Sequence, residues 1–278
     1  MAEIGVDHEL VQFKQLAEAV KHNFERHSVT LLMWDLDADV PVKMGSATCI
    51  ELRGVRYLLT AAHVLMDCDW KLRNPRAIGV VFREDGAANN AFVSRILAVG
   101  GKPQDSLDIA LLELSAEGAD EIASAKEFLP EMRVLEGGSA DQSRLFAVFG
   151  APKDWSPGSR VKRTFTAGPM CYVTVSCAPF PSHLDPSQDI ALEYEKSSNI
   201  SPSQEGTVEA PDPHGVSGGG IWLISQSQEG VLWDPNGSKL IGVQSRWNEK
   251  DGYVRGTQVQ CAFALLDGAG PAEVCANL

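Results

Sequence analysis

The sequence lacks the features that mark several common protein classes. None of its six cysteines forms a Cys-x-x-Cys pair, which argues against a zinc ribbon. No run approaches the roughly 18 apolar residues that a membrane-spanning helix needs. Basic residues are scarce, at 24 against 37 acidic ones for a net charge of −13. Because phosphate contacts need a basic face, we expect no nucleic-acid partner, and we expect no membrane partner either.

No targeting segment is visible at the amino terminus, which reads MAEIGVDHEL without a basic start or an apolar core. We therefore expect a soluble, cytoplasmic protein with reduced thiols, and a Cys49–Cys68 or Cys171–Cys177 disulfide is the alternative. The remaining composition, 44% hydrophobic and 22% charged, is that of a folded globular protein.

Residues 8–26 predict an amphipathic helix, with Asp7 as its N-cap. Such a helix either packs on the outside of the main domain or serves as a partner-binding or regulatory element. The apolar residues that recur at steps of three and four are Leu10, Phe13, Ala17, Val20 and Phe24.

Short apolar segments separated by turn-forming clusters then predict two strand-rich halves on either side of a partly helical connector at 115–130. Such halves fit two similar β-domains that face each other across a cleft. In the first half the segments are SVTLLMW, ATCIEL, RYLLTAA, AIGVVF, AFVSRILAV and DIALLEL. In the second they are RVLEG, RLFAVFG, KRTFTAG, MCYVTVSC, IALEYEK, GIWLIS, LIGVQS and VQCAFALL.

Ser217 stands in the Gly-rich segment HGVSGGGIW. A serine hydroxyl is a poor nucleophile that needs a neighbouring base and a place for the developing oxyanion. The glycines around it allow a tight turn, in which the N–H groups of Gly215 and Ser217 become candidate oxyanion donors. On its own the segment is equally compatible with a plain hairpin turn.

His63 and Asp108 flank other apolar strands, in TAAHVL and DSLDIALLEL. Asp108 adjoins a nearly continuous apolar run, where a buried carboxylate needs a hydrogen-bond partner such as a histidine N–H. Asp105, its rival, lies in a more polar turn. The order His63, Asp108, Ser217 is one of the known chain orders of the serine triad.

At residues 28–268 the chain resembles the trypsin-like (chymotrypsin-fold) serine peptidases of bacterial type. TAAHV is similar to the family's histidine motif, DIALL to its aspartate motif and GVSGGGIW to its nucleophile turn. Segments 148–152 and 240–245, VFGAP and LIGVQS, resemble strands of the HtrA-like and glutamyl-endopeptidase branches. Departures are Val216 where secreted members carry an acid, no cysteine after His63, and a third glycine at Gly220.

The resemblance implies an all-β fold of two antiparallel six-stranded β-barrels, a chymotrypsin-like double barrel, here with an N-terminal α-helix. The implied division is 1–27 for the helix, 28–114 for the first barrel, 115–130 for the connector and 131–278 for the second barrel. It also implies that Ser217 is the nucleophile, His63 the general base and Asp108 the residue that orients His63, with no cofactor and no metal.

The sequence says less about substrate preference than about the catalytic residues. By resemblance its candidates are His214, Gln244, Ser245, Arg246 and Thr257. Arg246 and His214 would favour an acidic side chain before the cut, whereas a solvated Arg246 would not. The negative net charge favours basic or neutral substrate segments instead.

The sequence thus predicts a serine endopeptidase that acts on protein or peptide substrates. The alternative is an inactive trypsin-like fold that acts as a protein-binding module, and an unrelated metalloenzyme is a distant third. A cytoplasmic peptidase must spare its host. We therefore expect a gate in the N-terminal helix, in the 196–213 loop or in a regulatory partner protein.

Overall fold

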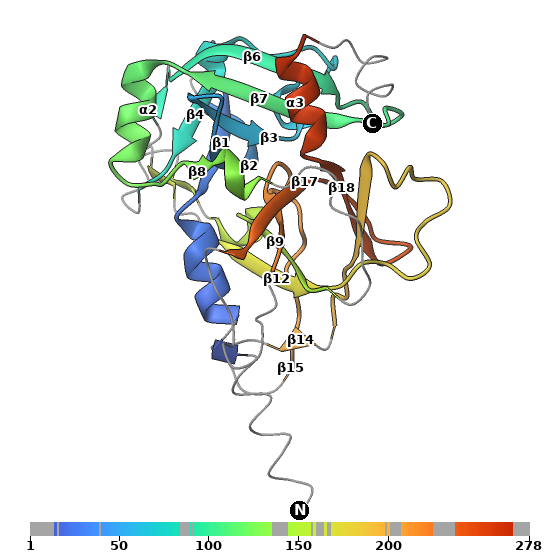
Figure 1. Ribbon diagram of the computed structural model, residues 1–278. Coiled ribbons are helices and arrows are strands. Elements are labelled where there is room, and N and C mark those ends of the chain that lie inside the picture. The colour runs from blue at the N-terminus through green and yellow to red at the C-terminus, as the bar shows by residue number, and fades with distance from the viewer. Residues whose placement is uncertain are drawn as a thin grey trace, which may run out of the picture.

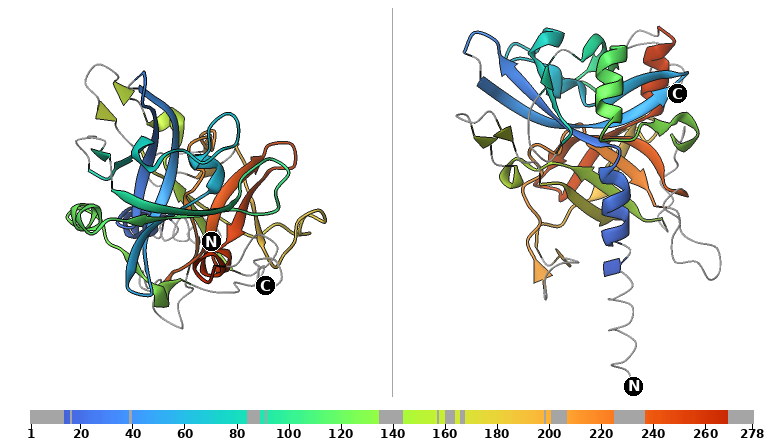
Figure 2. Two further views of the ribbon diagram at one scale, coloured as in Figure 1. Left: turned by 90° about the horizontal axis from the view of Figure 1, so that it is seen from above. Right: turned by 90° about the vertical axis from the view of Figure 1, so that its left-hand side faces the viewer.

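The structure is a computed structural model that describes most of the chain (Figures 1 and 2). Asp7, Leu10 and Phe13, named above, lie outside the described residues, and so does the sixth cysteine, Cys275. Within the described ranges, none of the helices combines the length and apolar character that crossing a bilayer requires. The described residues are 14–15, 17–38, 40–83, 89–90, 92–134, 144–156, 158–159, 164–165, 168–197, 199–200, 207–224 and 237–268.

The first sheet has eight strands in the order β5-β4-β1-β2-β3-β7-β6, with β8 paired to β2. All its pairings are antiparallel except the short β2–β8 pairing, which is parallel. The strands are β1 (Ser28–Asp35), β2 (Val40–Leu52), β3 (Val55–Thr60), β4 (Ile78–Val81), β5 (Asn89–Asn90), β6 (Val93–Gly100), β7 (Asp108–Leu114) and β8 (Leu129–Pro130).

The second sheet has six antiparallel strands in the order β12-β9-β16-β17-β18-β13. Two small hairpins, β10–β11 and β14–β15, stand apart from it. The sheet strands are β9 (Phe146–Gly150), β12 (Met170–Thr174), β13 (Asp189–Glu193), β16 (Gly220–Leu223), β17 (Lys239–Asn248) and β18 (Tyr253–Gln258). The hairpin strands are β10 (Gly158–Ser159), β11 (Thr164–Phe165), β14 (Asn199–Ile200) and β15 (Thr207–Val208).

Among the described residues the helices are few and short. The chain is helical at residues 14–15 and 17–25, as the apolar periodicity predicts. The other helices are α2 (Ala116–Ala123), α3 (Gln260–Leu266) and the 3₁₀ turns η1 (Ala62–Leu65), η2 (Pro75–Ala77), η3 (Glu131–Arg133) and η4 (Lys153–Trp155). Ser115 caps α2 by accepting a hydrogen bond from the Gly118 N–H.

The predicted all-β fold of two antiparallel sheets with an N-terminal helix is confirmed. All six segments expected in the first half contain strands, and β5 and β8 add two short ones. The segment VQCAFALL was predicted wrongly, because it forms α3 and not a strand. Its run of Ala, Leu and Gln favours a helix, and strand β18 comes instead from the polar segment YVRGTQ just before it.

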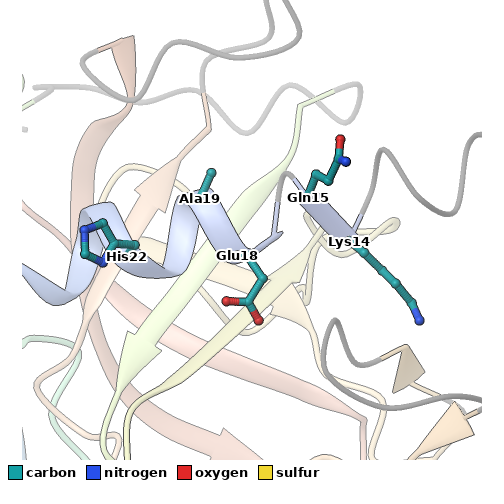
Figure 3. Close-up of a pocket in the computed structure, with 5 residues that line it drawn as sticks. All are labelled: Lys14, Gln15, Glu18, Ala19 and His22. Carbon is teal, nitrogen blue, oxygen red and sulfur yellow. The ribbon is translucent and has the colours of Figure 1, made fainter.

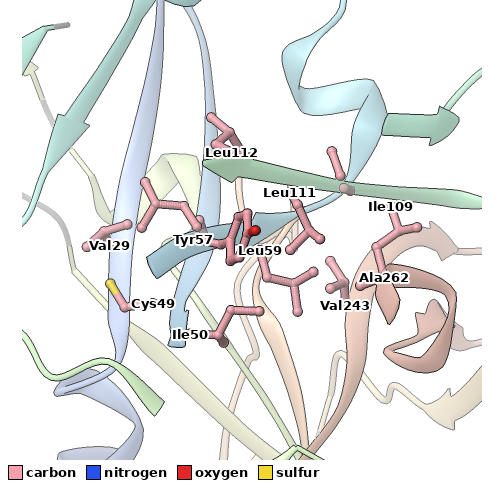
Figure 4. Packing of buried hydrophobic residues seen from close by; sticks show 14 of the residues in the cluster. Val29, Cys49, Ile50, Tyr57, Leu59, Ile109, Leu111, Leu112, Val243 and Ala262 are labelled. Atoms are coloured by element: carbon pink, nitrogen blue, oxygen red, sulfur yellow. The ribbon is translucent and has the colours of Figure 1, made fainter. Parts of the chain in front are cut away.

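The main hydrophobic core lies under the first sheet and extends to α3 and the N-terminal helix. In Figure 4, Ile109 and Leu111 of β7 share this core with Val243 of β17 and Ala262 of α3. Helix α3 lies within the range 131–278 that the sequence assigns to the second barrel, yet it packs against β6 and β7. A separate, smaller hydrophobic core is formed mostly by residues of the second sheet.

The N-terminal helix joins the two sheets. Its Phe24 ring is fully buried and stacks on Trp222 of β16, with centroids 4.3 Å apart and planes 12° from parallel. The His27 carbonyl accepts a hydrogen bond from the Cys49 N–H of β2 at 2.7 Å. The helix therefore contacts the strand that directly follows the Gly-rich segment of Ser217.

The five described cysteines are free, so neither disulfide considered from the sequence is present. Burial raises the pKa of the Cys49 and Cys171 thiols to about 12. These two thiols are consequently protonated and unreactive near neutral pH.

Candidate active site

His63 and Asp108 form a hydrogen-bonded pair at the edge of the first sheet. His63 lies in η1, directly after β3, and Asp108 is the first residue of β7. The His63 Nδ1 atom is 2.7 Å from Asp108 Oδ2, and the His63 backbone N–H donates to Asp108 Oδ1 at 2.9 Å. The Asp108 side chain is 4% exposed and that of His63 18% exposed. Two bonds from one carboxylate fix both the backbone and the ring of His63.

Two residues of the second sheet also contact Asp108. The Arg246 guanidinium group of β17 is 3.5 Å from Asp108 Oδ2, and the Asp108 N–H donates to Thr257 Oγ1 of β18 at 3.2 Å. Arg246 Nη2 donates to the carbonyl groups of Gly101 and Lys102 at 3.1 and 2.7 Å. The guanidinium group is thus bonded to the first sheet beside the aspartate.

Lys43 of β2 brings a second cation to this region, because its ammonium group donates to the His63 carbonyl. Burial lowers the pKa of Lys43, and the neighbouring Arg73 lowers it further, while the Asp108 carboxylate opposes this shift. The His63–Asp108 pair therefore has positively charged groups nearby on both sheets.

Ser217 lies in the turn that leads into β16. Gly215 and Gly218 have φ values of +96° and +87°, which side chains with a Cβ rarely adopt. The Val216 N–H donates to the Pro213 carbonyl, and the Gly218 N–H to that of Gln244. The N–H groups of Gly215 and Ser217 have no acceptor among the described residues. The turn thereby leaves unpaired the two amides that the sequence marks as oxyanion donors.

Strand β2 runs between the histidine and the serine. A Cβ placed on Gly45 would clash with the Val64 side chain and lie 3.1 Å from the Ser217 carbonyl oxygen. Val64 directly follows His63 in the chain, so Gly45 touches the neighbour of the histidine on one side and the serine on the other. The structure thus brings His63, Asp108 and Ser217 to one junction between the sheets.

Ser217 is partly buried, and its hydroxyl forms no hydrogen bond with any described residue, His63 included. Catalytic hydrogen bonds are often long or poorly aligned without substrate and tighten when substrate binds. The hydrogen bond between the Ser217 hydroxyl and His63 is the expected contact that is not formed.

The pocket candidates are dispersed. Gln244 is 1% exposed, and its Oε1 atom is buried without a partner. Ser245 donates to the Arg255 carbonyl at 3.2 Å. His214 is 77% exposed and pairs with Asp212 at 2.8 Å. Of the five residues predicted for the pocket, Arg246 and Thr257 contact Asp108, as described above, and Gln244 offers an unpaired buried group beside the nucleophile turn.

Neither of two other kinds of site, a surface hollow or a metal site, includes the predicted catalytic residues. A hollow beside the N-terminal helix is lined by Lys14, Gln15, Glu18, Ala19 and His22, and Figure 3 shows that it contains none of the predicted site residues. Across the described ranges, no three His, Cys, Asp or Glu side chains are grouped so as to hold a metal ion.

Sequence reasoning missed the contributions of Lys43, Gly45 and Ser46 in β2. Their segment, VKMGS, carries no catalytic motif and has the composition of an ordinary strand end. Only the pairing of distant segments brings it against the nucleophile turn, where the Ser46 N–H donates to the Ser217 carbonyl at 2.8 Å. The glycine and serine side by side in a strand were the only local signal.

Comparison with known proteins finds relatives in structure and not in sequence. No protein-family profile and no curated protein matches the chain. A Glu endopeptidase solved in complex with MPD superimposes with a TM-score of 0.51 at 12% identity, covering 87% of this chain and 90% of that one. A serine endoprotease from Yersinia pestis gives a TM-score of 0.49 at 16% identity, covering 91% of this chain and 65% of that one.

At this identity the likeness to the Glu endopeptidase shows the fold alone. The two curled antiparallel sheets are those of the chymotrypsin-like double β-barrel, the fold of trypsin-like serine peptidases.

Proposed function

We propose that this protein is a serine endopeptidase that hydrolyses peptide bonds through His63, Asp108 and Ser217. The observation that carries the proposal is the pair of hydrogen bonds between His63 and a nearly buried Asp108, next to a turn with two unpaired amides. A carboxylate that holds the Nδ1 side of an imidazole leaves its Nε2 atom available to accept a proton.

In this reaction the Ser217 Oγ atom attacks the carbonyl carbon of the peptide bond while His63 Nε2 takes the hydroxyl proton. The N–H groups of Gly215 and Ser217 stabilise the negatively charged oxygen of the tetrahedral intermediate. His63 then gives its proton to the leaving amine as the C–N bond breaks. Water, activated by the same histidine, hydrolyses the acyl-enzyme and restores Ser217.

A fluorophosphonate probe tests the proposal, because an activated serine displaces its fluoride and becomes covalently labelled. We expect labelling of the wild type and none of Ser217→Ala. Ser115→Ala, which removes the cap of α2 away from the site, should label like the wild type. Wild-type protein that is folded and remains unlabelled would contradict the proposal.

The alternative is a non-catalytic protein-binding module on the same fold. The unbonded Ser217 hydroxyl favours it, whereas the formed His63–Asp108 pair favours the enzyme. The same experiment separates the two, since a binding module is unlabelled. Proteomic detection of new N-termini with the wild type against Ser217→Ala then identifies the substrates.

We further propose that the enzyme is of bacterial type, acts in the cytoplasm without a cofactor and is gated by a regulatory element or partner. Selection for an acidic side chain by Arg246 and His214 is the less favoured preference. The Arg246 guanidinium group is engaged by two carbonyls and Asp108. Cleavage of a peptide library decides the preference directly.

A further inference from the structure

Ser46 of β2 is a buried serine that the mechanism above does not use. Ser46 is 1% exposed and lies in the first sheet, far in sequence from Ser217. Each of its polar groups is hydrogen-bonded, and the partners belong to three separate segments. The bonds are Ser46 N–H to the Ser217 carbonyl at 2.8 Å, Ser46 Oγ to the Gly215 carbonyl at 3.0 Å, Ala151 N–H to Ser46 Oγ at 2.9 Å, and Thr60 Oγ1 to the Ser46 carbonyl at 2.8 Å.

The direction of the hydroxyl bond is determined by its neighbours. A backbone N–H can only donate, so the Ser46 oxygen accepts from Ala151. A carbonyl can only accept, so the single hydroxyl proton is donated to Gly215. A residue without a hydroxyl would leave the buried N–H of Ala151 and the carbonyl of Gly215 without this partner.

Ser46 supplies half of the bonds that hold the carbonyl groups of the nucleophile turn. Each of the four carbonyls from His214 to Ser217 accepts a hydrogen bond, which fixes the orientation of the four peptide planes. Their donors, in chain order, are Lys153 N at 2.7 Å, Ser46 Oγ at 3.0 Å, Gly219 N at 2.7 Å and Ser46 N at 2.8 Å.

The orientation of these planes determines where the unpaired amides point. In a trans peptide the C=O and N–H groups point in opposite directions. The His214 carbonyl is bonded to Lys153, so the Gly215 N–H points away from Lys153. The next plane carries the Gly215 carbonyl, whose one described donor is the Ser46 hydroxyl, and the Val216 N–H, which donates to the Pro213 carbonyl at 3.0 Å. Because Gly215, at φ +96°, has no side chain to restrict rotation, loss of the Ser46 bond would leave this plane held by the Val216 bond alone.

We propose that Ser46 is a positioning residue for the oxyanion site, whose hydroxyl holds the Gly215–Val216 peptide so that the Gly215 and Ser217 amides converge. The proposal rests on the proposed function. Thr60, which binds the Ser46 carbonyl, stands three residues before His63. Ser46 therefore also links β3, the strand that leads to the histidine, to the turn that carries the serine.

The first test is the kinetics of Ser46→Ala on p-nitrophenyl acetate, with Ser46→Thr as the variant that keeps the hydroxyl. We expect kcat to fall about 10- to 100-fold in Ser46→Ala with KM nearly unchanged, because an oxyanion contact acts only in the transition state. Ser46→Thr should recover most of the rate. Ser28→Ala is the matched control, since it removes a hydroxyl bonded to the Phe24 carbonyl at 2.9 Å in the same sheet.

The second test is hydrogen exchange, which does not depend on activity. Loss of the Ser46 hydroxyl should speed exchange of the Val216 and Gly219 amides about tenfold, and Ser28→Ala should not. An active wild type with unchanged kcat and unchanged exchange in Ser46→Ala overturns the inference. An inactive, unlabelled wild type overturns the proposed function instead, and the exchange result then decides whether Ser46 holds the turn.

Discussion

The two halves of the candidate site are held in different ways. In the first sheet, one side chain fixes another: Asp108 binds both the ring and the backbone of His63 from the start of a regular strand. In the second sheet, Ser217 lies in a turn whose backbone depends on bonds from other segments, two of them from Ser46 of the first sheet.

The difference has a physical reason. Strand ends beside apolar runs give a carboxylate a defined place, and a hydrogen bond to a charged group is strong enough to hold a ring. A turn with two left-handed glycines has no such intrinsic order and needs its carbonyls bonded from outside. The histidine of the acid–base half is consequently fixed by a residue of its own sheet, with Arg246 and Thr257 as added contacts from the second sheet. The backbone of the nucleophile turn depends more directly on contact between the sheets.

The largest effect should come from Asp108→Asn. An amide cannot stabilise the cationic form of His63, so we expect kcat on p-nitrophenyl acetate to fall about 10⁴-fold while the protein stays folded. The matched control is Asp105→Asn, in the neighbouring turn, where the carboxylate accepts from the Lys102 N–H at 2.8 Å. Equal losses in both variants would show that Asp108 has no special role and would contradict the idea that it holds His63 in place.

Gly215→Ala should cost about 100- to 1000-fold in kcat, the usual effect of losing one oxyanion donor. A Cβ at this position would lie 2.8 Å from the Ala151 carbonyl oxygen and from Lys153 N, so the turn must shift. Gly252→Ala is the control, because Gly252 has φ +66° but its Cβ would meet no atom closer than 3.8 Å. It should lower the melting temperature without changing kcat.

Much of this arrangement could be predicted from local sequence. Alternating and continuous apolar runs identified the six main strands of the first sheet, and the three motifs placed His63, Asp108 and Ser217 at strand ends. These are local signals, since each depends on a few neighbouring residues. The order of the three motifs along the chain then predicted that these residues belong to one site.

The remainder could not be predicted because it depends on tertiary contacts. The polar segment of β18 becomes a strand through pairing with β13 and β17. VQCAFALL is apolar enough for either structure, and its place against β6 and β7 gives its buried face a partner as a helix. Likewise, nothing near Ser46 or Arg246 in the sequence indicates their contacts with Gly215 and Asp108.

Arg246→Gln should have a moderate effect, about tenfold in kcat, because it removes charge-assisted bonds that join β17 to Gly101 and Lys102 beside Asp108. Arg246→Lys should recover part of the rate. Arg95→Gln, which breaks an exposed pair with Glu113 far from the candidate site, should match the wild type. A loss confined to peptides with an acidic residue before the cut would instead assign Arg246 to substrate recognition.

The smallest effect concerns His27, at the end of the N-terminal helix that joins the two sheets. His27 is 3% exposed, and its ring nitrogen Nδ1 bonds to the Glu127 carbonyl at 2.8 Å beside Trp222. Burial lowers the pKa of His27 below its ordinary value of 6.5, and Arg133 and Arg26 oppose its protonation while Glu127 favours it.

The unfolded chain therefore binds this proton at a higher pH than the folded protein does, so stability falls as the pH drops below about 6.5. His27→Gln can keep the bond to the Glu127 carbonyl but cannot titrate. We expect the melting temperature of this variant to fall less than that of the wild type between pH 7 and pH 5, by at most about 4 °C. The exposed His22→Gln is the control and should keep the wild-type slope, and equal slopes for His27→Gln and the wild type would show that protonation of His27 does not destabilise the protein.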